Sequence, residues 1–205
     1  MKGVYGLIMK IIAATSNPGK VKEIKKIFSG PELEIVSMKE AGIDIEVEEN
    51  GTSFEENALI KARAISELSK CAVFADDSGL CVDALGGRPG IYSARYAGEN
   101  ATDGERIEKL LSELVGEKNR RARFVSVVAF ITANGREFCA SGEVLGRLTE
   151  EIKGDGGFGY DPVFYSDELR KTFGEASTEE KNSISHRARA IHSLYEILKE
   201  NKILS

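Results

Sequence analysis

The sequence lacks a long hydrophobic run. None of its 205 residues belongs to a stretch approaching the roughly 18 to 20 apolar residues that a transmembrane helix needs. The amino-terminal segment also lacks the long apolar core and small-residue cleavage site of a signal peptide. We therefore expect a soluble, cytosolic protein without a membrane partner.

Cysteine is scarce, and its spacing excludes one kind of metal site. Cys71, Cys81 and Cys139 lie far apart in apolar surroundings, and none has the CxxC spacing of a thiolate site. We interpret all three as reduced core residues. The fold should need no disulfide and no structural metal.

The chain has no excess of positive charge, since its formal net charge is −5. A polyanion such as nucleic acid would need a local basic patch to overcome this field. The candidate patch is Arg120, Arg121 and Arg123, which we interpret as a solvated turn ahead of a strand. Nucleic acid is therefore not an expected partner.

No repeat, low-complexity tract or Pro-rich linker interrupts the chain. A hydrophobic fraction of 41% and a charged fraction of 30% are ordinary for a globular protein. We expect residues 1–205 to form one domain, in which any two lobes share the chain.

Capping signals and periodicity predict alternating strands and helices. A short strand over 10–15 is followed by Asn17 as N-cap and Pro18 at the first helical position. Capping boxes at Ser53 with Glu56 and at Thr102 with Glu105 open two more helices. Further strands are expected over 71–75, 123–132 and 137–148, with a hairpin turn at 134–135 and a last helix from residue 185. Such an alternation with a hairpin predicts an α/β fold with a mixed sheet.

The segment TSNPGK, residues 15–20, joins the first strand to the first helix. Its backbone amides and the helix dipole should converge on an anion, which Lys20 can reach from one turn inside. The Walker pattern GxxxxGK[ST] is absent. A plain capped helix start is an equally good interpretation of this segment alone.

Asp76 and Asp77 follow the apolar run 71–75, and we expect them in an acidic turn over 76–79. Adjacent carboxylates repel each other unless a cation or hydrogen-bond donors compensate. A hard cation such as Mg²⁺ would do so. The alternative is an ordinary turn aspartate beside an exposed one.

A second acidic stretch, Glu46, Glu48 and Glu49, precedes the helix that carries Lys61. It offers a further carboxylate to a metal site built from oxygen ligands. We interpret Glu46 and Glu48 as part of a solvated acidic face.

Two later segments carry groups suited to a nucleobase. The glycine-rich run 156–162 places Phe158, Tyr160 and Asp161 on a flexible backbone, which suits stacking and hydrogen bonding. Lys181, His186 and Arg187 cluster around the start of the last helix, where the dipole disfavours cations and an anionic or carbonyl-bearing ligand would stabilise them. Buried aromatics in a glycine-rich bend are the alternative for the first segment, and His192 is interpreted as structural or surface.

Taken together, five motifs resemble one known family. They are TSNPGK, then SFEENALIKA, then FADDSGL with GGRPGIYSARYAG, then GGFGYDP and finally EEKNSISHR. In this order and approximate spacing, over residues 10–199, the chain resembles the inosine triphosphate pyrophosphatases, which hydrolyse aberrant purine nucleotides. The set is far more specific than any single motif.

The resemblance implies an elongated two-lobed α/β fold around a curved mixed sheet flanked by helices, with an active-site cleft between the lobes. It implies a homodimer, and hydrolysis of ITP, dITP and XTP to the monophosphate and pyrophosphate with Mg²⁺. Relatives usually begin near Lys10, so residues 9–205 form the common core, Met1–Ile8 is an extension, and Met1 and Met9 are alternative starts. Many relatives have glycine where this chain has Ser16.

The resemblance also implies roles for individual residues. The phosphates would be held by Thr15, Ser16, Asn17, Pro18, Gly19, Lys20, Lys61 and Ser78. Glu49 and Asp77 would bind Mg²⁺ with Asp76 in support, and Asp77 would also act as the base. The nucleobase would be held by Phe158, Gly159, Tyr160, Asp161, Lys181, His186 and Arg187.

Other functions remain as alternatives. A pyrophosphatase of related fold could act on pyrimidine triphosphates, although GGFGYDP and SHR argue against it. A phosphatase of the haloacid dehalogenase type needs a DxD spacing that Asp76 and Asp77 do not provide. A non-catalytic nucleotide sensor would keep the phosphate loop, and the acidic balance disfavours an RNA-binding module.

Overall fold

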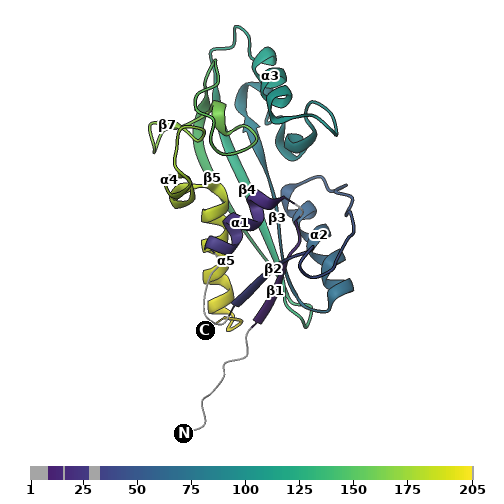
Figure 1. Ribbon diagram of the computed structural model, residues 1–205. Helices are drawn as coiled ribbons and strands as arrows, with labels where there is room; N and C mark the ends of the chain where they lie inside the picture. Colours follow the sequence, from purple (N-terminus) through teal and green to yellow (C-terminus); the bar gives the residue numbers. More distant parts are fainter. Residues whose placement is uncertain (1–8, 16, 28–32, 205) are drawn as a thin grey trace. The chain divides into compact units, whose positions relative to one another are not determined.

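The computed structural model describes residues 9–15, 17–27 and 33–204 (Figure 1). The expectations for Met1–Ile8 and Ser16 lie outside these ranges. The helices are α1 (Pro18–Ile27), α2 (Phe54–Ser69), α3 (Asp103–Glu113), α4 (Thr178–Ile184) and α5 (His186–Glu200). The strands are β1 (Met9–Ala13), β2 (Leu33–Ser37), β3 (Ala72–Val82), β4 (Arg121–Ile131), β5 (Glu137–Leu148), β6 (Phe164–Ser166) and β7 (Lys171–Thr172). Short 3-10 helices cover Asp83–Leu85, Gly90–Arg95 and Asp161–Val163.

The described strands form one seven-stranded sheet in the order β2-β1-β3-β4-β5-β6-β7. β1 pairs in parallel with both β2 and β3, whereas β6 pairs in antiparallel fashion with β5 and β7. The sheet is therefore mixed. The predicted α/β fold is confirmed.

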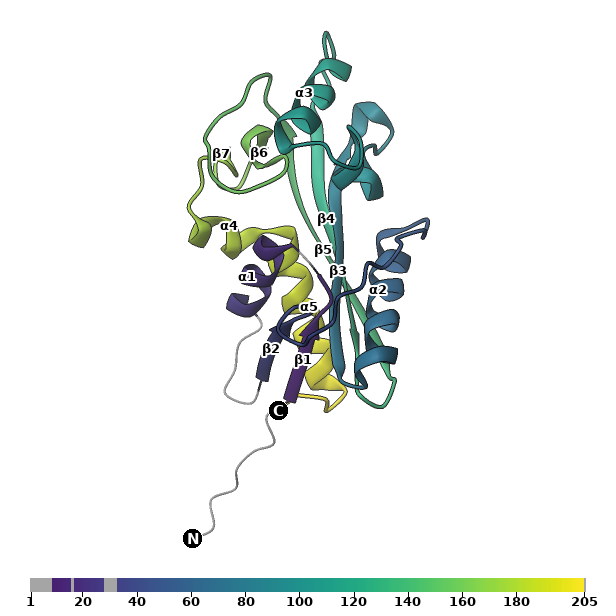
Figure 2. The same ribbon diagram turned by 45° about the vertical axis from the view of Figure 1, so that its right-hand side comes forward.

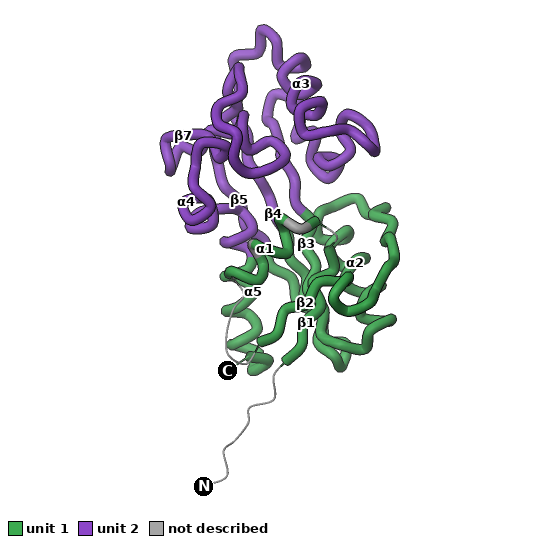
Figure 3. Tube along the Cα trace, viewed as in Figure 1, with its two compact units in different colours: residues 1–77, 127–140, 191–205 green, residues 78–126, 141–190 purple. Residues whose placement is uncertain are grey.

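The chain divides into two compact units (Figure 3). Unit 1 comprises residues 1–77, 127–140 and 191–205, and unit 2 comprises residues 78–126 and 141–190. Strands β3, β4 and β5 each contribute residues to both units. This repeated sharing of strands explains why no linker marks a boundary in the sequence. The cleft between lobes remains a prediction.

In unit 1, helices cover both faces of the sheet. Figures 1 and 2 show α2 on one side of β1 and β3, and α1 with the carboxy-terminal part of α5 on the other. Ala58 and Ala62 of α2 pack with Val73 and Ala75 of β3. Because side chains alternate along a strand, the buried Phe74 points to the opposite face.

In unit 2, aromatic side chains fill much of the core. The Phe124 ring lies 4.6 Å from the Phe164 ring, and Phe164 lies 5.1 Å from Phe173. Ile107 and Leu110 of α3 are buried in the same cluster. The predicted capping box that starts α3 is confirmed, with Thr102 and Glu105 bonded reciprocally.

Two helix starts differ from expectation. Ser53 Oγ accepts a bond from the Glu56 amide, but the Glu56 carboxylate accepts from the Thr52 amide and hydroxyl, so the predicted capping box at α2 is only half formed. Helix α4 was not predicted, although Ser177 and Glu180 form a complete capping box there. Its length of seven residues is too short for apolar periodicity to reveal.

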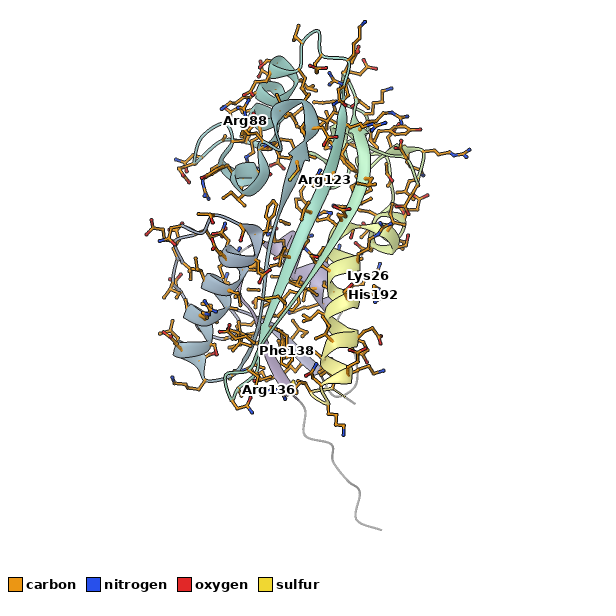
Figure 4. All side chains as sticks on the ribbon, turned by 180° about the vertical axis from the view of Figure 1, so that it is seen from behind. Lys26, Arg88, Arg123, Arg136, Phe138 and His192 are labelled. Atoms are coloured by element: carbon orange, nitrogen blue, oxygen red, sulfur yellow. The ribbon has the colours of Figure 1, made fainter. Side chains whose placement is uncertain are left out.

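Several interpretations of single residues are confirmed. The three cysteines are free thiols, with Cys81 buried and Cys71 and Cys139 half-buried. His192 is exposed on α5, where Figure 4 labels it.

Two of the three arginines considered as a basic patch make side-chain contacts within unit 2. Arg120 donates to the carbonyl oxygens of Leu148 and Thr149, and Arg123 pairs with Asp83 at 3.5 Å. Arg121 is exposed at the first position of β4, so the expected turn ends earlier and Arg121 and Arg123 belong to the strand. Among the described residues, no helix is both long and apolar enough to cross a membrane.

Candidate active site

Asp76 and Asp77 lie inside strand β3, so the expected acidic turn over 76–79 is wrong. The strand continues from Ala72 to Val82 through both carboxylates. Both aspartates are buried. Because side chains alternate along the strand, the two carboxylates leave it on opposite faces, which reduces their mutual repulsion.

Asp76 is paired with a lysine from the start of α1. Lys20 Nζ lies 3.1 Å from Asp76 Oδ2. Asn17 caps this helix as predicted, since its Oδ1 accepts bonds from the Gly19 and Lys20 amides at 2.9 and 3.3 Å. Thr15 Oγ1 in turn accepts from the Asn17 amide at 3.2 Å. The predicted phosphate-binding segment therefore places the Lys20 ammonium group beside β3.

Asp77 faces two residues of α2. Asn57 Nδ2 donates to Asp77 Oδ2 at 3.1 Å, and Lys61 Nζ lies 3.7 Å from Asp77 Oδ1. The same ammonium lies 3.1 Å from Glu49 Oε1. Burial raises the pKa of Asp77, while the charge of Lys61 opposes this shift. Lys61 is therefore a cation within reach of two carboxylates.

Asn57 is a site residue that sequence reasoning missed. It is fully buried, and its Oδ1 accepts a bond from the Gly51 amide at 2.9 Å. It thus joins the segment before α2 to Asp77. The available signal was its spacing, because Asn57 and Lys61 are four residues apart and share one helix face.

The donor chemistry of Glu49 and Asp77 fits a hard divalent cation. Carboxylate oxygens are the ligands that such cations prefer. The Lys61 ammonium group already places one positive charge beside both carboxylates. Within the described part of the chain, no three His, Cys, Asp or Glu side chains gather as a ready metal-binding group. Asp76, whose side chain leaves β3 on the opposite face from Asp77, pairs with Lys20.

In unit 2, Ser78 is joined to the start of α5. Arg187 Nη2 donates to Ser78 Oγ at 3.1 Å, and Arg187 is almost fully buried. The two residues are 109 positions apart in sequence. The structure therefore brings together two predicted ligand-binding residues from different motifs.

The GGFGYDP segment folds around the Asp161 carboxylate. Asp161 Oδ2 accepts bonds from the Phe158 amide at 2.8 Å and from Lys181 Nζ at 2.7 Å. Gly157 has φ of +76°, and a Cβ there would collide with this carboxylate. Glycine is therefore required at this position both for conformation and for space.

Tyr160 and Gly159 anchor the same segment. Tyr160 is buried and its hydroxyl donates to the Ser93 carbonyl oxygen at 3.0 Å. Burial raises the pKa of Tyr160, which keeps the hydroxyl protonated as a donor. The Gly159 amide donates to Asp103 Oδ2 at 2.7 Å. These bonds fix the backbone that presents Phe158.

Two cations lie near the Phe158 ring. Lys181 Nζ lies 4.4 Å from the ring centroid and Arg187 Cζ lies 5.9 Å from it. His186 instead stacks on Phe124 with centroids 4.9 Å apart. The predicted cluster of Lys181, His186 and Arg187 is thus gathered around two aromatic rings of unit 2.

The buried pair of Lys181 and Asp161 should be important for stability. The side chains are only 7% and 3% exposed. Lys181→Met would leave the Asp161 charge buried without its cation, so we expect unfolding free energy to fall by about 3 to 5 kcal/mol. Urea denaturation measures this change.

The pair of Lys171 and Glu180 is a matched control. It has a similar distance of 2.8 Å, but its side chains are 34% and 43% exposed. Lys171→Met should cost less than about 1 kcal/mol, because solvent screens exposed pairs. Equal losses in the two variants would contradict a special role for the buried pair.

The described site residues thus form two groups, one in each unit. Unit 1 holds Thr15, Asn17, Gly19, Lys20, Glu49, Asn57, Lys61, Asp76 and Asp77. Unit 2 holds Ser78, Phe158, Gly159, Tyr160, Asp161, Lys181, His186 and Arg187. Ser78 follows Asp77 directly along β3, so the two groups are adjacent in sequence.

Known structures resemble this fold along almost its whole length. A Ham1 protein from Staphylococcus aureus has a TM-score of 0.85 and 44% identity, with 94% of this chain and 99% of that chain covered. A HAM1 protein from Coxiella burnetii has a TM-score of 0.86 and 38% identity at the same coverage.

Sequence relatives agree with the structural comparison. A dITP/XTP pyrophosphatase from Clostridium perfringens is 50% identical over 198 residues, covering 93% of this chain and 97% of its own. A protein of the same name from Bacillus subtilis is 48% identical over 195 residues, covering 94% and 98%. The sequence profile of the Ham1 family matches residues 11–197. This chain therefore belongs to the Ham1 family.

Proposed function

We propose that this chain hydrolyses nonstandard purine nucleoside triphosphates, namely ITP, dITP and XTP, to the monophosphate and pyrophosphate. Two relatives that match almost the whole chain bear the name dITP/XTP pyrophosphatase. The Ham1 family profile, which matches residues 11–197, spans both groups of site residues. The activity is thus supported by family membership, and the residue roles below are our own assignments.

The observation that carries the proposal is the charge arrangement in unit 1. Lys20 and Lys61 are held beside Asp76 and Asp77, at 3.1 and 3.7 Å. Hydrolysis between the α and β phosphorus atoms needs an activated water and cations on the departing pyrophosphate. In our assignment Asp77 takes the proton from water, and the two lysines hold the pyrophosphate.

Glu49 and Asp77 would hold Mg²⁺, with Asp76 acting through Lys20. When bound, Mg²⁺ would neutralise charge that develops on the phosphate oxygens. Asn57 would orient the Asp77 carboxylate through its 3.1 Å hydrogen bond. The amides at the start of α1 would bind phosphate oxygens, helped by the helix dipole.

The groups in unit 2 suit a purine base. Phe158 offers a ring for stacking, and Lys181 and Arg187 are donor-only side chains near that ring. Hypoxanthine and xanthine carry an acceptor oxygen at position 6, where adenine carries an amino group. Donor-only groups would therefore favour the first two bases.

Product analysis tests this proposal. The purified protein with Mg²⁺ should release pyrophosphate, and not orthophosphate, from ITP and XTP. EDTA should lower the rate by about a hundredfold or more, because the reaction loses its charge-neutralising cation.

The other outcomes identify the alternatives. Orthophosphate as the product would indicate a phosphatase, a preference for dUTP would indicate a pyrimidine enzyme, and nucleotide binding without turnover would indicate a sensor. Full activity in EDTA would contradict the metal assignment alone. The homodimer and the cytosolic location stay predictions, and sedimentation analysis tests the first of them.

A further inference from the structure

Ser93 is a buried serine whose hydroxyl both accepts and donates. It lies in the 3-10 helix Gly90–Arg95 and is 7% exposed. Its Oγ accepts a bond from the Leu80 amide at 2.9 Å and donates to the Gly90 carbonyl oxygen at 2.6 Å. A hydroxyl group can serve as acceptor and donor at once, whereas a methyl group can do neither. Alanine at this position would lose both bonds.

The segment after β3 folds back along that strand. β1 pairs with β3 over residues 72–74. Farther along, the Val82 amide donates to the Arg88 carbonyl oxygen at 3.2 Å, and Cys81 forms an antiparallel bridge with Pro89. The contact extends to Leu80, whose amide donates to the Ser93 hydroxyl. Residues 88–93 thus accept hydrogen bonds from β3 amides that would pair with a neighbouring strand in a regular sheet.

Gly79 shows how close this approach is. A Cβ on Gly79 would collide with the Gly90 carbonyl oxygen and with Ser93 Oγ. The backbone of β3 therefore touches the Ser93 turn directly, one residue after Ser78. A small movement of Ser93 must move this part of the strand, because packed interiors leave no slack.

The carbonyl group of Ser93 contacts a second ligand-binding segment. It accepts the Tyr160 hydroxyl at 3.0 Å, and Tyr160 stands between Phe158 and Asp161 in the GGFGYDP segment. Both contacts lie within unit 2. One residue therefore holds β3 next to Ser78 with its side chain, and the base-binding segment with its backbone.

We propose that Ser93 is a positioning residue that sets the spacing between Ser78 on β3 and Tyr160 in the GGFGYDP segment. Ser93 touches neither substrate nor metal in this assignment. It acts through the two segments that do. The inference rests on the proposed function, because substrate binding is its readout.

Steady-state kinetics with ITP test the proposal. Ser93→Ala should raise KM about tenfold and leave kcat within about threefold, because both segments shift while the catalytic groups of unit 1 keep their contacts. Ser126→Ala is the matched control, since Ser126 is 0% exposed and its hydroxyl makes no hydrogen bond within the described residues. Ser126→Ala should leave KM unchanged.

A double-mutant cycle separates positioning from simple stability. Tyr160→Phe removes the bond to the Ser93 carbonyl oxygen and should also raise KM. If Ser93 acts by placing Tyr160, Tyr160→Phe should raise KM only slightly further in a protein that already carries Ser93→Ala. The inference would be overturned if the factors by which Ser93→Ala and Tyr160→Phe raise KM multiplied in the double mutant. It would also be overturned if Ser93→Ala had the same KM as Ser126→Ala.

A milder variant keeps the proposal testable if Ser93→Ala does not fold. Ser93→Cys fills nearly the same volume, but its longer and weaker hydrogen bonds should displace the turn and raise KM measurably. An unchanged KM in this variant would also overturn the inference. Failure of the proposed function looks different, because wild type and Ser126→Ala would then release no pyrophosphate.

Discussion

Replacing Asp77 by asparagine is expected to lower kcat by about three powers of ten. The variant keeps the size of the side chain and an oxygen that can accept the Asn57 bond of 3.1 Å. It removes the negative charge that Lys61 contacts at 3.7 Å and the group that would take the proton from water. Turnover should therefore be lost while the fold is retained. Pyrophosphate release from ITP measures kcat, and calorimetric titration with ITP checks that binding persists.

Asp83→Asn is the control for this charge change. Asp83 is exposed and pairs with Arg123 at 3.5 Å in unit 2, and neither residue is assigned to the reaction. Its kcat should stay within about twofold of wild type, because exposed ion pairs contribute little. Near-normal turnover in Asp77→Asn would rule out Asp77 as the base, whatever the control does.

Local signals in the sequence were enough to predict most of the helices. Asn17 before Pro18 and Thr102 before Glu105 each satisfy amides within three residues, so sequence neighbours determine the start of the helix. The hairpin at Gly135 is equally local, since φ of +84° requires glycine or a similarly tolerant residue. Such features depend on no distant partner.

The interior of β3 could not be predicted in this way. The continuous apolar run stops at Ala75, and two carboxylates normally end a buried strand. The strand continues because Lys20 and Lys61 arrive from two helices that are distant in sequence. Their arrival depends on tertiary packing, which periodicity does not report. Asn57 was missed for the same reason, because its partner Asp77 is 20 residues away.

Discrimination between bases is the second large effect that we expect. Values of kcat/KM for ITP and XTP should exceed that for ATP by about 10⁴, the penalty typical of sites built to hydrogen-bond a substrate group. Lys181 and Arg187 can only donate, so neither side chain could accept a hydrogen bond from the amino group of adenine. Steady-state assays with each nucleotide supplied separately give the kcat/KM values and hence the ratio.

Purine riboside triphosphate separates this explanation from a steric one. It carries only hydrogen at position 6, so it fits any pocket that accepts hypoxanthine but offers the donors no oxygen at that position. If donors near Phe158 determine the choice, this analogue should be nearly as poor as ATP, because buried donors left unpaired are costly. If the shape of the pocket determines it, the analogue should approach ITP. Equal turnover of ATP and ITP would contradict both explanations. Lys181 and Arg187 would then not recognise the group at position 6.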